Sequence, residues 1–64
     1  TGKRRAVIEN YRNIQSYTRE EILVLTSSGR LVIRGKHLVI PCYTPLELCI
    51  RGQIESITLE EGNK

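Results

Sequence analysis

The side chains that could act as soft metal ligands or nucleophiles are His37, Cys42 and Cys49. A structural zinc site needs four nitrogen or sulfur ligands, and the spacing of these three residues fits no familiar zinc motif. A Cys–His nucleophile would also need an oxyanion hole and a pocket, which nothing in the sequence supplies. A disulfide would close only a short loop, and no secretory signal supports one. We therefore interpret Cys42 as a loop thiol and Cys49 as a small strand residue, and we predict no metal and no cofactor.

The carboxylates are no better placed for catalysis. Glu20-Glu21 and Glu60-Glu61 are adjacent pairs, and neighbouring side chains on one element point in different directions, so neither pair suits two-carboxylate acid–base chemistry. The chain also contains no phosphate-binding loop and no dinucleotide-binding glycine motif. The sequence predicts no catalytic residues and a protein that is not an enzyme.

A near-repeat dominates the elements that would position these side chains. Residues 31–35 (LVIRG) are echoed by residues 48–52 (LCIRG), and each copy is followed by a second apolar run, 38–40 or 54–57. Alternation of apolar and other residues indicates strands. A glycine permits a bend that a residue with a Cβ resists. We predict two bent strand–glycine–strand units, with structural bends at Gly35 and Gly52 and a hairpin loop closed by Gly29.

The other segments also favour strands. Residues 6–9 and 22–26 are apolar runs, and residues 10–13 are expected to form a turn. Residues 18–21 (TREE) fit a helical capping box, but the segment before Ser27 is only about two turns long, so a strand with at most one helical turn is favoured. The predicted fold is all-β: a small antiparallel, bent-strand sheet that forms a compact barrel or sandwich of about five to seven short strands.

The length of 64 residues indicates one small domain, 1–64, whose stability is marginal unless a partner covers part of it. We expect its core at residues 6–59, between a basic N-terminal flank (1–5) and a polar tail (60–64). No apolar run approaches the roughly 20 residues of a membrane-spanning helix, so no transmembrane segment is expected.

Alternation divides the predicted strands into two faces. One face should form the main core, and its members are Leu31, Ile33, Leu48 and Ile50. Either Ile22 or Leu23 should join this core, together with the residue two positions further along the chain. The opposite face is a candidate interaction surface, which consists of Val32, Arg34, Lys36, Cys49 and Arg51. Residues 23–25 and 38–40 are aliphatic on both faces, which a single sheet with one wet face would not need. Either the sheet folds over itself or a second copy covers it, and we expect a homo-oligomer, most simply a dimer.

The net charge of +3 is mildly basic, and acidic residues are interspersed with basic ones from the middle of the chain onward. Proteins that bind single-stranded nucleic acid combine a basic groove with stacking aromatic rings. Tyr11, Tyr17 and Tyr43 all fall in predicted loops, where a loop-anchoring role is expected. Nucleic acid is therefore an unlikely partner, and a small basic β-barrel that binds nucleic acid or an anionic membrane surface is the alternative.

The assembled pattern resembles the YabP/YqfC family of sporulation proteins of endospore-forming bacteria over residues 7–59. The resemblance is carried by residues 8–10 (IEN), 22–25 (ILVL), 29–40 (GRLVIRGKHLVI) and 48–57 (LCIRGQIESI). The GQIExI stretch at the end is most similar to the YqfC branch. These motifs are typical of a fold and carry no catalytic group.

The resemblance implies a non-catalytic role in spore formation, as an assembly or adaptor module in the mother cell. It also implies a cytoplasmic protein, peripheral at the forespore membrane, with a sporulation membrane protein as partner. The family has no established enzymatic activity or cofactor, so it supplies no catalytic residues for this chain.

Overall fold

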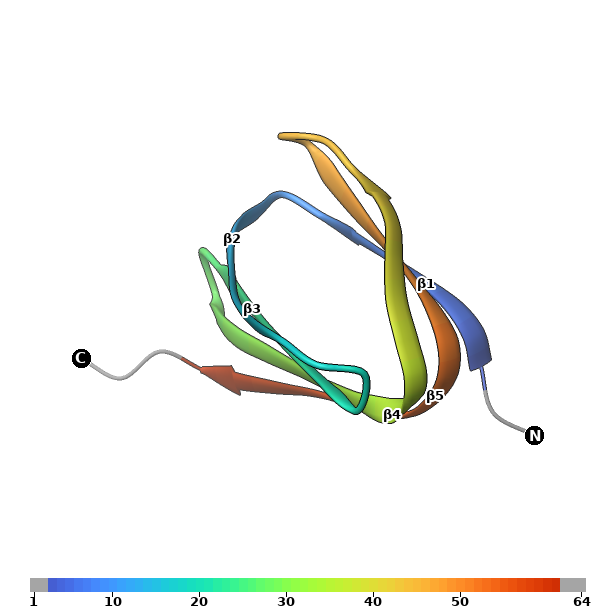
Figure 1. Cartoon of the computed structure of the whole chain (residues 1–64). Helices are drawn as coiled ribbons and strands as arrows, with labels where there is room; N and C mark the ends of the chain where they lie inside the picture. Colours follow the sequence, from blue (N-terminus) through green and yellow to red (C-terminus); the bar gives the residue numbers. More distant parts are fainter. Residues whose placement is uncertain (1–2, 62–64) are drawn as a thin grey trace.

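The computed structural model describes residues 3–61, and they form one five-stranded antiparallel sheet without a helix. The strands are β1 (Lys3–Glu9), β2 (Tyr11–Tyr17), β3 (Glu21–Thr26), β4 (Gly29–Tyr43) and β5 (Glu47–Glu61), in the order β1-β5-β4-β3-β2. The predicted all-β antiparallel class is confirmed. β1 and β2 lie at opposite ends of this order, yet only Asn10 separates them in the chain. The sheet must therefore curl until the end of β1 lies beside the start of β2, and the result is a partly open barrel (Figure 1).

The two longest strands replace four of the predicted short ones. β4 and β5 have 15 residues each, and each contains one copy of the near-repeat together with the apolar run that follows it. They pair with each other along most of their length and turn together through one corner (Figure 1). The register of the pair shifts between Arg34 and Gly35 and again between Lys36 and Val39, which places the corner at the glycine of the first repeat.

Both repeat glycines lie where the backbones of β4 and β5 approach each other most closely. A Cβ at Gly35, where φ is not positive, would collide with the carbonyl oxygen of Gln53. Gly52 has a φ of 135°, and a Cβ there would lie 2.6 Å from the carbonyl oxygen of His37. His37 itself has a φ of 56°, which few residues other than glycine adopt. Gly29, with a φ of 146°, ends the turn between β3 and β4.

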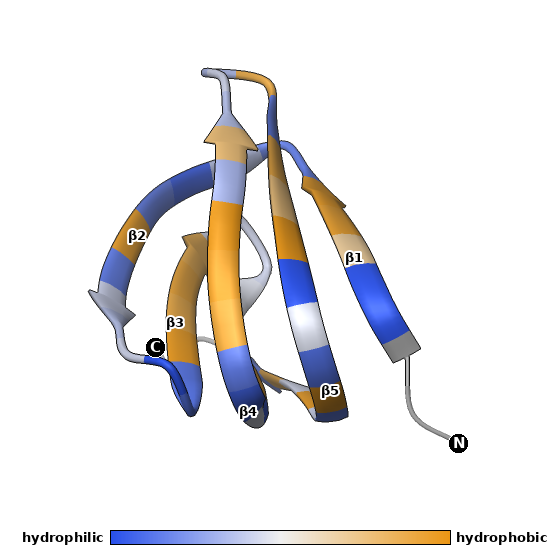
Figure 2. Cartoon of the chain, turned by 45° about the vertical axis from the view of Figure 1, so that its right-hand side comes forward, coloured by the Kyte–Doolittle hydropathy of each residue, from blue (hydrophilic) through white to orange (hydrophobic). Residues whose placement is uncertain are grey.

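The core lies inside the curl of the sheet. Ile33, Leu48 and Ile50 are fully buried, as their alternation predicts, and Leu31 packs against them at the margin. Between the two alternatives for β3, the structure selects Ile22, which is fully buried together with Val24. Burial of each such side chain contributes about 1.5–3 kcal/mol. The core also contains Ile8, Leu38 and Ile54. In Figure 2 the apolar middle of β4 contrasts with the mainly hydrophilic β2.

Threonines organise the hairpin turns. The Oγ1 atom of Thr18 accepts hydrogen bonds from the backbone N–H groups of Glu20 (3.2 Å) and Glu21 (2.9 Å). Thr44 repeats the arrangement with Leu46 (3.2 Å) and Glu47 (3.0 Å). In both turns the threonine N–H also donates to the carbonyl oxygen three residues on, at 2.8 Å. The helical capping signal at residues 18–21 is therefore a hairpin turn, and no helical turn forms there.

Several predicted boundaries were wrong. The turn expected at residues 10–13 contracts to Asn10, whose φ of 60° suits asparagine, and β2 begins at Tyr11. Cys42, expected in a loop, lies in β4 together with Tyr43. Glu60 and Glu61 belong to β5, whereas residues 62–64 of the expected tail and residues 1–2 of the expected flank lie outside the described residues.

We expect Gly35→Ala to lower the free energy of unfolding by roughly 2 kcal/mol, because the new methyl group would push against the backbone of β5. Thermal unfolding followed by circular dichroism should show a midpoint lower by about 10 °C for a domain of this size. Ser56→Ala, at an exposed position of β5, is the control and should move the midpoint little. Equal midpoints for the two variants would contradict the close approach at Gly35.

Candidate binding groove

Within the part of the chain that the structure describes, two strand edges lack a strand partner and face each other across the open side of the barrel. β2 pairs only with β3, so its other edge is unpaired. β3 pairs with β4 only as far as Arg34, beyond which the N–H groups of Gly35 and Leu38 donate to the β2–β3 turn, at 3.0 and 2.8 Å. Residues 39–43 of β4 then pair with β5 alone. Pro41, which has no N–H group to donate, lies in this one-sided stretch, as expected for an edge.

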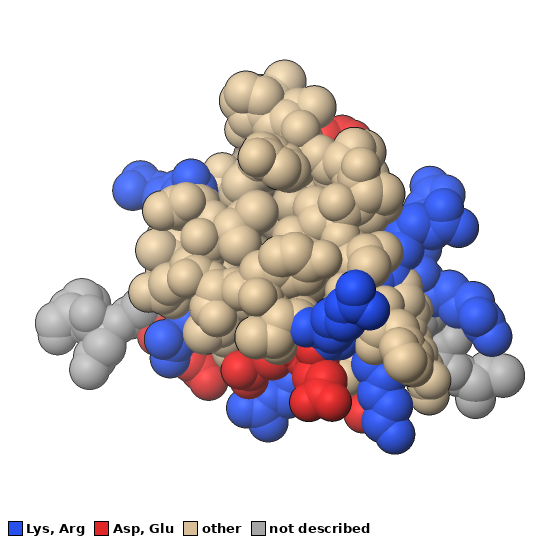
Figure 3. Space-filling model, in the orientation of Figure 1, with Lys and Arg blue, Asp and Glu red and all other residues tan. Residues whose placement is uncertain are grey.

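A groove of about 480 Å³ lies between these edges, and all three tyrosines of the chain line it. Its lining consists of Tyr11, Arg12, Asn13, Ile14, Tyr17, Ile40 and Tyr43. Uncharged atoms cover the middle of this face, and the charged side chains lie around its rim (Figure 3). We call this lining the tyrosine groove.

The tyrosines differ in how firmly they are held. Tyr11 is half-buried, packs against the core and donates its hydroxyl proton to the carbonyl oxygen of Thr44 at 2.7 Å. This hydrogen bond joins the start of β2 to the β4–β5 turn. Tyr17 and Tyr43 are 49% and 64% exposed, and Ile14 and Ile40 pack against the core beneath the groove. Fixed apolar walls with two exposed phenol rings suit binding, since such rings supply apolar area and a polar tip together.

Sequence reasoning missed this groove because the spacing in β2 is irregular. Tyr11, Ile14 and Tyr17 recur every third residue, which fits neither side of a regular strand. The register between β2 and β3 shifts between Tyr11 and Asn13 and again between Ile14 and Ser16. These two shifts bring the three side chains to the same side of the strand. The sequence did contain a signal, which is three large side chains at equal intervals. These side chains share one side of β2 only because two bulges interrupt the strand.

Part of the candidate interaction surface is covered. Val32 is only 5% exposed. Two ion pairs flank it on the same face of the sheet: Arg30 with Glu60 at 2.6 Å and Arg34 with Glu21 at 3.0 Å. The aliphatic stems of long charged side chains cover apolar surface while the charges stay in water. Arg34 is therefore engaged with β3, and Val32 presents little surface to a partner.

The remaining predicted surface residues lie further along the convex face. Arg51 is directly opposite Arg5 of β1, and both are exposed. Cys49 is half-buried and lies opposite Val7 on one side and Cys42 on the other. Lys36 is exposed opposite Gln53. The structure thus brings Cys49 and Arg51 together with Arg5, while Arg34 is held by Glu21.

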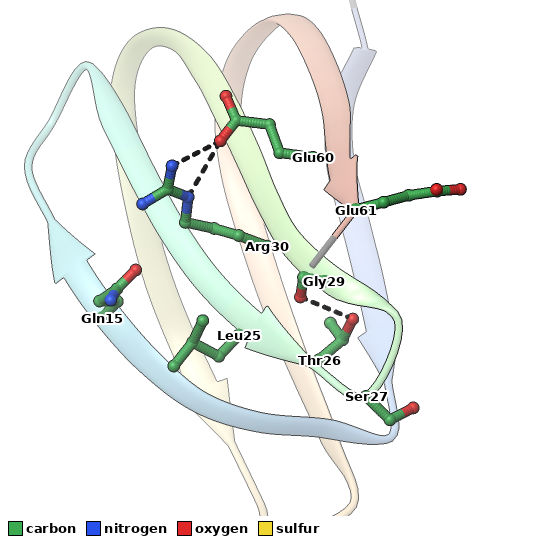
Figure 4. Close-up of a pocket in the computed structure, with 8 residues that line it drawn as sticks. All are labelled: Gln15, Leu25, Thr26, Ser27, Gly29, Arg30, Glu60 and Glu61. Atoms are coloured by element: carbon green, nitrogen blue, oxygen red, sulfur yellow. Dashed lines mark hydrogen bonds and ion pairs between the residues drawn. The ribbon is translucent and has the colours of Figure 1, made fainter. Parts of the chain in front are cut away.

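A second hollow, of about 460 Å³, lies beside the β3–β4 turn (Figure 4). Leu25 and Gln15 border it from β3 and β2, and the guanidinium group of Arg30 is held by Glu60 across it. The hydroxyl of Thr26 donates to the carbonyl oxygen of Gly29 at 2.9 Å, which fixes the turn. Because its basic group is already neutralised, this hollow offers less to a ligand than the tyrosine groove.

Residues 3–61 contain no cluster of three or more His, Cys, Asp or Glu side chains that could hold a metal ion. Nor does this part of the chain include a helix suited to crossing a membrane.

Comparison with known proteins identifies the family of the chain and a curated relative. The whole chain, residues 1–64, matches the YabP family. It is 28% identical over 61 residues to the uncharacterized protein YqfC of Bacillus subtilis (strain 168). The matched region covers 95% of this chain and 66% of that relative, so the chain spans slightly less than two thirds of the relative's length.

We expect Tyr11→Phe to reduce stability by about 1 kcal/mol, the usual contribution of one hydrogen bond, because the tie to Thr44 is lost. Amide hydrogen exchange at residues 42–47 should accelerate, since the β4–β5 turn loses its contact with β2. Tyr17→Phe is the matched control, because the Tyr17 hydroxyl makes no hydrogen bond within the described residues. Unchanged exchange at the turn in Tyr11→Phe would show that the hydrogen bond does not hold the groove together.

Proposed function

This chain belongs to the YabP family, and we propose that it is a non-catalytic binding module of spore formation. In this proposal the tyrosine groove binds an extended, largely uncharged segment of a partner protein. The observation that carries the proposal is the convergence of all three tyrosines between two unpaired strand edges.

Unpaired edges favour a protein segment in an extended conformation. The free edge of β2 and residues 39–43 of β4 present backbone N–H and C=O groups that have no strand partner. An added strand would satisfy these groups, and its alternate side chains would enter the groove. Tyr17 and Tyr43 are suited to contact them, because tyrosine is among the residues that contribute most to binding at protein interfaces.

The charge of the groove argues against nucleic acid as the occupant. Among residues 3–61, Arg12 is the only charged residue that lines the groove, whereas a protein that binds single strands needs a basic path along the phosphates. The charged side chains lie mainly at the rim of this face (Figure 3). An uncharged peptide would lose little solvation here, while a polyanion would find a single countercharge.

The finer parts of the proposal come from the family resemblance. We propose that the module acts as an adaptor in the mother-cell cytoplasm and docks a sporulation membrane protein at the forespore surface. Self-association belongs to the same proposal, because Val39, Ile57 and Leu59 are 40–45% exposed. Such apolar positions on both halves of the long hairpin favour contact with a second copy.

Selection from a library of short random peptides tests the groove. We expect the selected peptides to be extended and mostly uncharged, and to shift the backbone amide resonances of residues 11–17 and 39–43. The double variant Tyr17→Ala, Tyr43→Ala should bind them at least about tenfold more weakly, because two aromatic contacts are removed.

Val7→Ala, Leu46→Ala is the matched control, since it removes two similarly exposed apolar side chains outside the groove. Light scattering beforehand shows whether the chain is a monomer or an oligomer at the concentration of the assay. Peptides that shift only the amide resonances of the convex face would show that the tyrosine groove is not the binding site. Binding of phosphatidylglycerol vesicles through Arg5 and Arg51, without any peptide binding, would favour the membrane alternative.

In the bacterium that carries this chain, we expect the same tyrosine double variant to lower the yield of heat-resistant spores while vegetative growth stays normal. The physical reason is that the variant binds the partner more weakly while its core is unchanged. Immunoblots must show equal amounts of the variant and of the Val7→Ala, Leu46→Ala control. If the tyrosine variant gave the full yield of spores while deletion of the gene lowered it, the protein would act in sporulation but not through the tyrosine groove.

A further inference from the structure

The two cysteines of the chain are direct neighbours on adjacent strands. Cys42 near the end of β4 lies opposite Cys49 of β5 in the antiparallel register. Residues that face each other in such a pair have Cα atoms about 4.5–5.5 Å apart. A disulfide accepts Cα separations of about 4.4–6.8 Å. The backbone therefore already holds the two sulfur atoms within bridging range.

We propose that Cys42 and Cys49 form a cross-strand dithiol site, which a low-molecular-weight disulfide oxidises to an intramolecular disulfide. The site is separate from the tyrosine groove and independent of the function proposed for it. The chain contains no other cysteine, so this bridge is the only disulfide that one copy can form.

The turn beside the pair keeps the register fixed. Thr44 and Glu47 close the β4–β5 turn through a backbone hydrogen bond of 2.8 Å, and the Thr44 hydroxyl accepts from the N–H groups of Leu46 and Glu47. A slipped hairpin would move the cysteines to different faces or apart. Because the register is set by the turn, the reduced protein is already arranged for the oxidised state.

The two thiols differ in access to solvent. Cys42 is exposed, whereas Cys49 is half-buried. The pKa of Cys49 is raised, chiefly by hydrogen bonding with the Cys42 thiol and then by desolvation. Cys49 therefore keeps its proton at neutral pH, and Cys42 is the sulfur that an incoming disulfide meets first. The charge of Arg5 lowers the pKa of Cys49, but this effect is smaller than the rise that the nearby Glu47 carboxylate causes.

The reaction is a pair of thiol–disulfide exchanges. The Cys42 thiolate attacks one sulfur of the oxidant RS–SR, the S–S bond breaks, and one RS⁻ leaves. Cys49 then loses its proton, attacks Sγ of Cys42 in the mixed disulfide and expels the second RS⁻. The two protons of the protein thiols end on the two leaving groups, so one dithiol and one disulfide become one protein disulfide and two RSH.

The test equilibrates the purified chain with mixtures of reduced and oxidised glutathione, followed by alkylation and mass spectrometry. We expect a monomer that has lost two hydrogen atoms and carries no glutathione. The native chain should reach half-oxidation at a ratio of oxidised to reduced glutathione at least about tenfold lower than the chain in guanidinium chloride, because the fold holds the thiols together. Oxidation should also raise the thermal midpoint by roughly 10 °C.

Two single variants test the order of the steps. Cys49→Ser should accumulate the mixed disulfide at Cys42, and Cys42→Ser should react more slowly, because its remaining thiol is half-buried. Circular dichroism checks that both keep the fold. Equal half-oxidation ratios for the native and unfolded chains, a lower thermal midpoint after oxidation, or bridges only between molecules would each overturn the proposal.

Discussion

The structure depends on the close approach of β4 and β5 at Gly35 and Gly52. Each glycine faces a backbone carbonyl group of the other strand, from Gln53 and His37 respectively. Both strands turn the same corner, and each has an outer neighbour along its first half: β3 pairs with the first half of β4, and β1 pairs with the first half of β5. One hairpin thus supplies the centre of the whole sheet, which lets 64 residues enclose a core.

The same corner creates the unpaired edges. Since β3 ends where β4 bends, residues 39–43 have no second strand partner. β1 accompanies β5 only as far as Ile54, so within the described residues 55–61 are likewise one-sided. The two open edges differ in chemistry. The edge of β5 carries Glu55, Glu60 and Glu61, while the groove beside β4 carries aromatic rings and one arginine.

Much of the fold follows from local pattern, because alternation and glycine act over a few residues. Alternation placed Ile33, Leu48 and Ile50 in the core, and the near-repeat located the corner. The groove and the cysteine pair depend instead on register. Two bulges in β2 align its tyrosines, and a β4 that continues past Pro41 brings Cys42 opposite Cys49. Register of this kind is set by bulges and by turn geometry, which the alternation of residues within one strand does not reveal.

The two open edges differ in how well they are protected against pairing with another strand. Natural sheets protect exposed edges with charged side chains, proline or bulges, because an unprotected edge pairs with other chains. Three glutamates mark the edge of β5. Glu60 is paired with Arg30, but the like charges of Glu55 and Glu61 oppose pairing with a second copy of the same edge. β2 has bulges but only Arg12 as a charged residue, and the exposed ring of Tyr17 lies at its end. The edge of β2 is therefore the one less protected against an added strand, and it is the edge that borders the tyrosine groove.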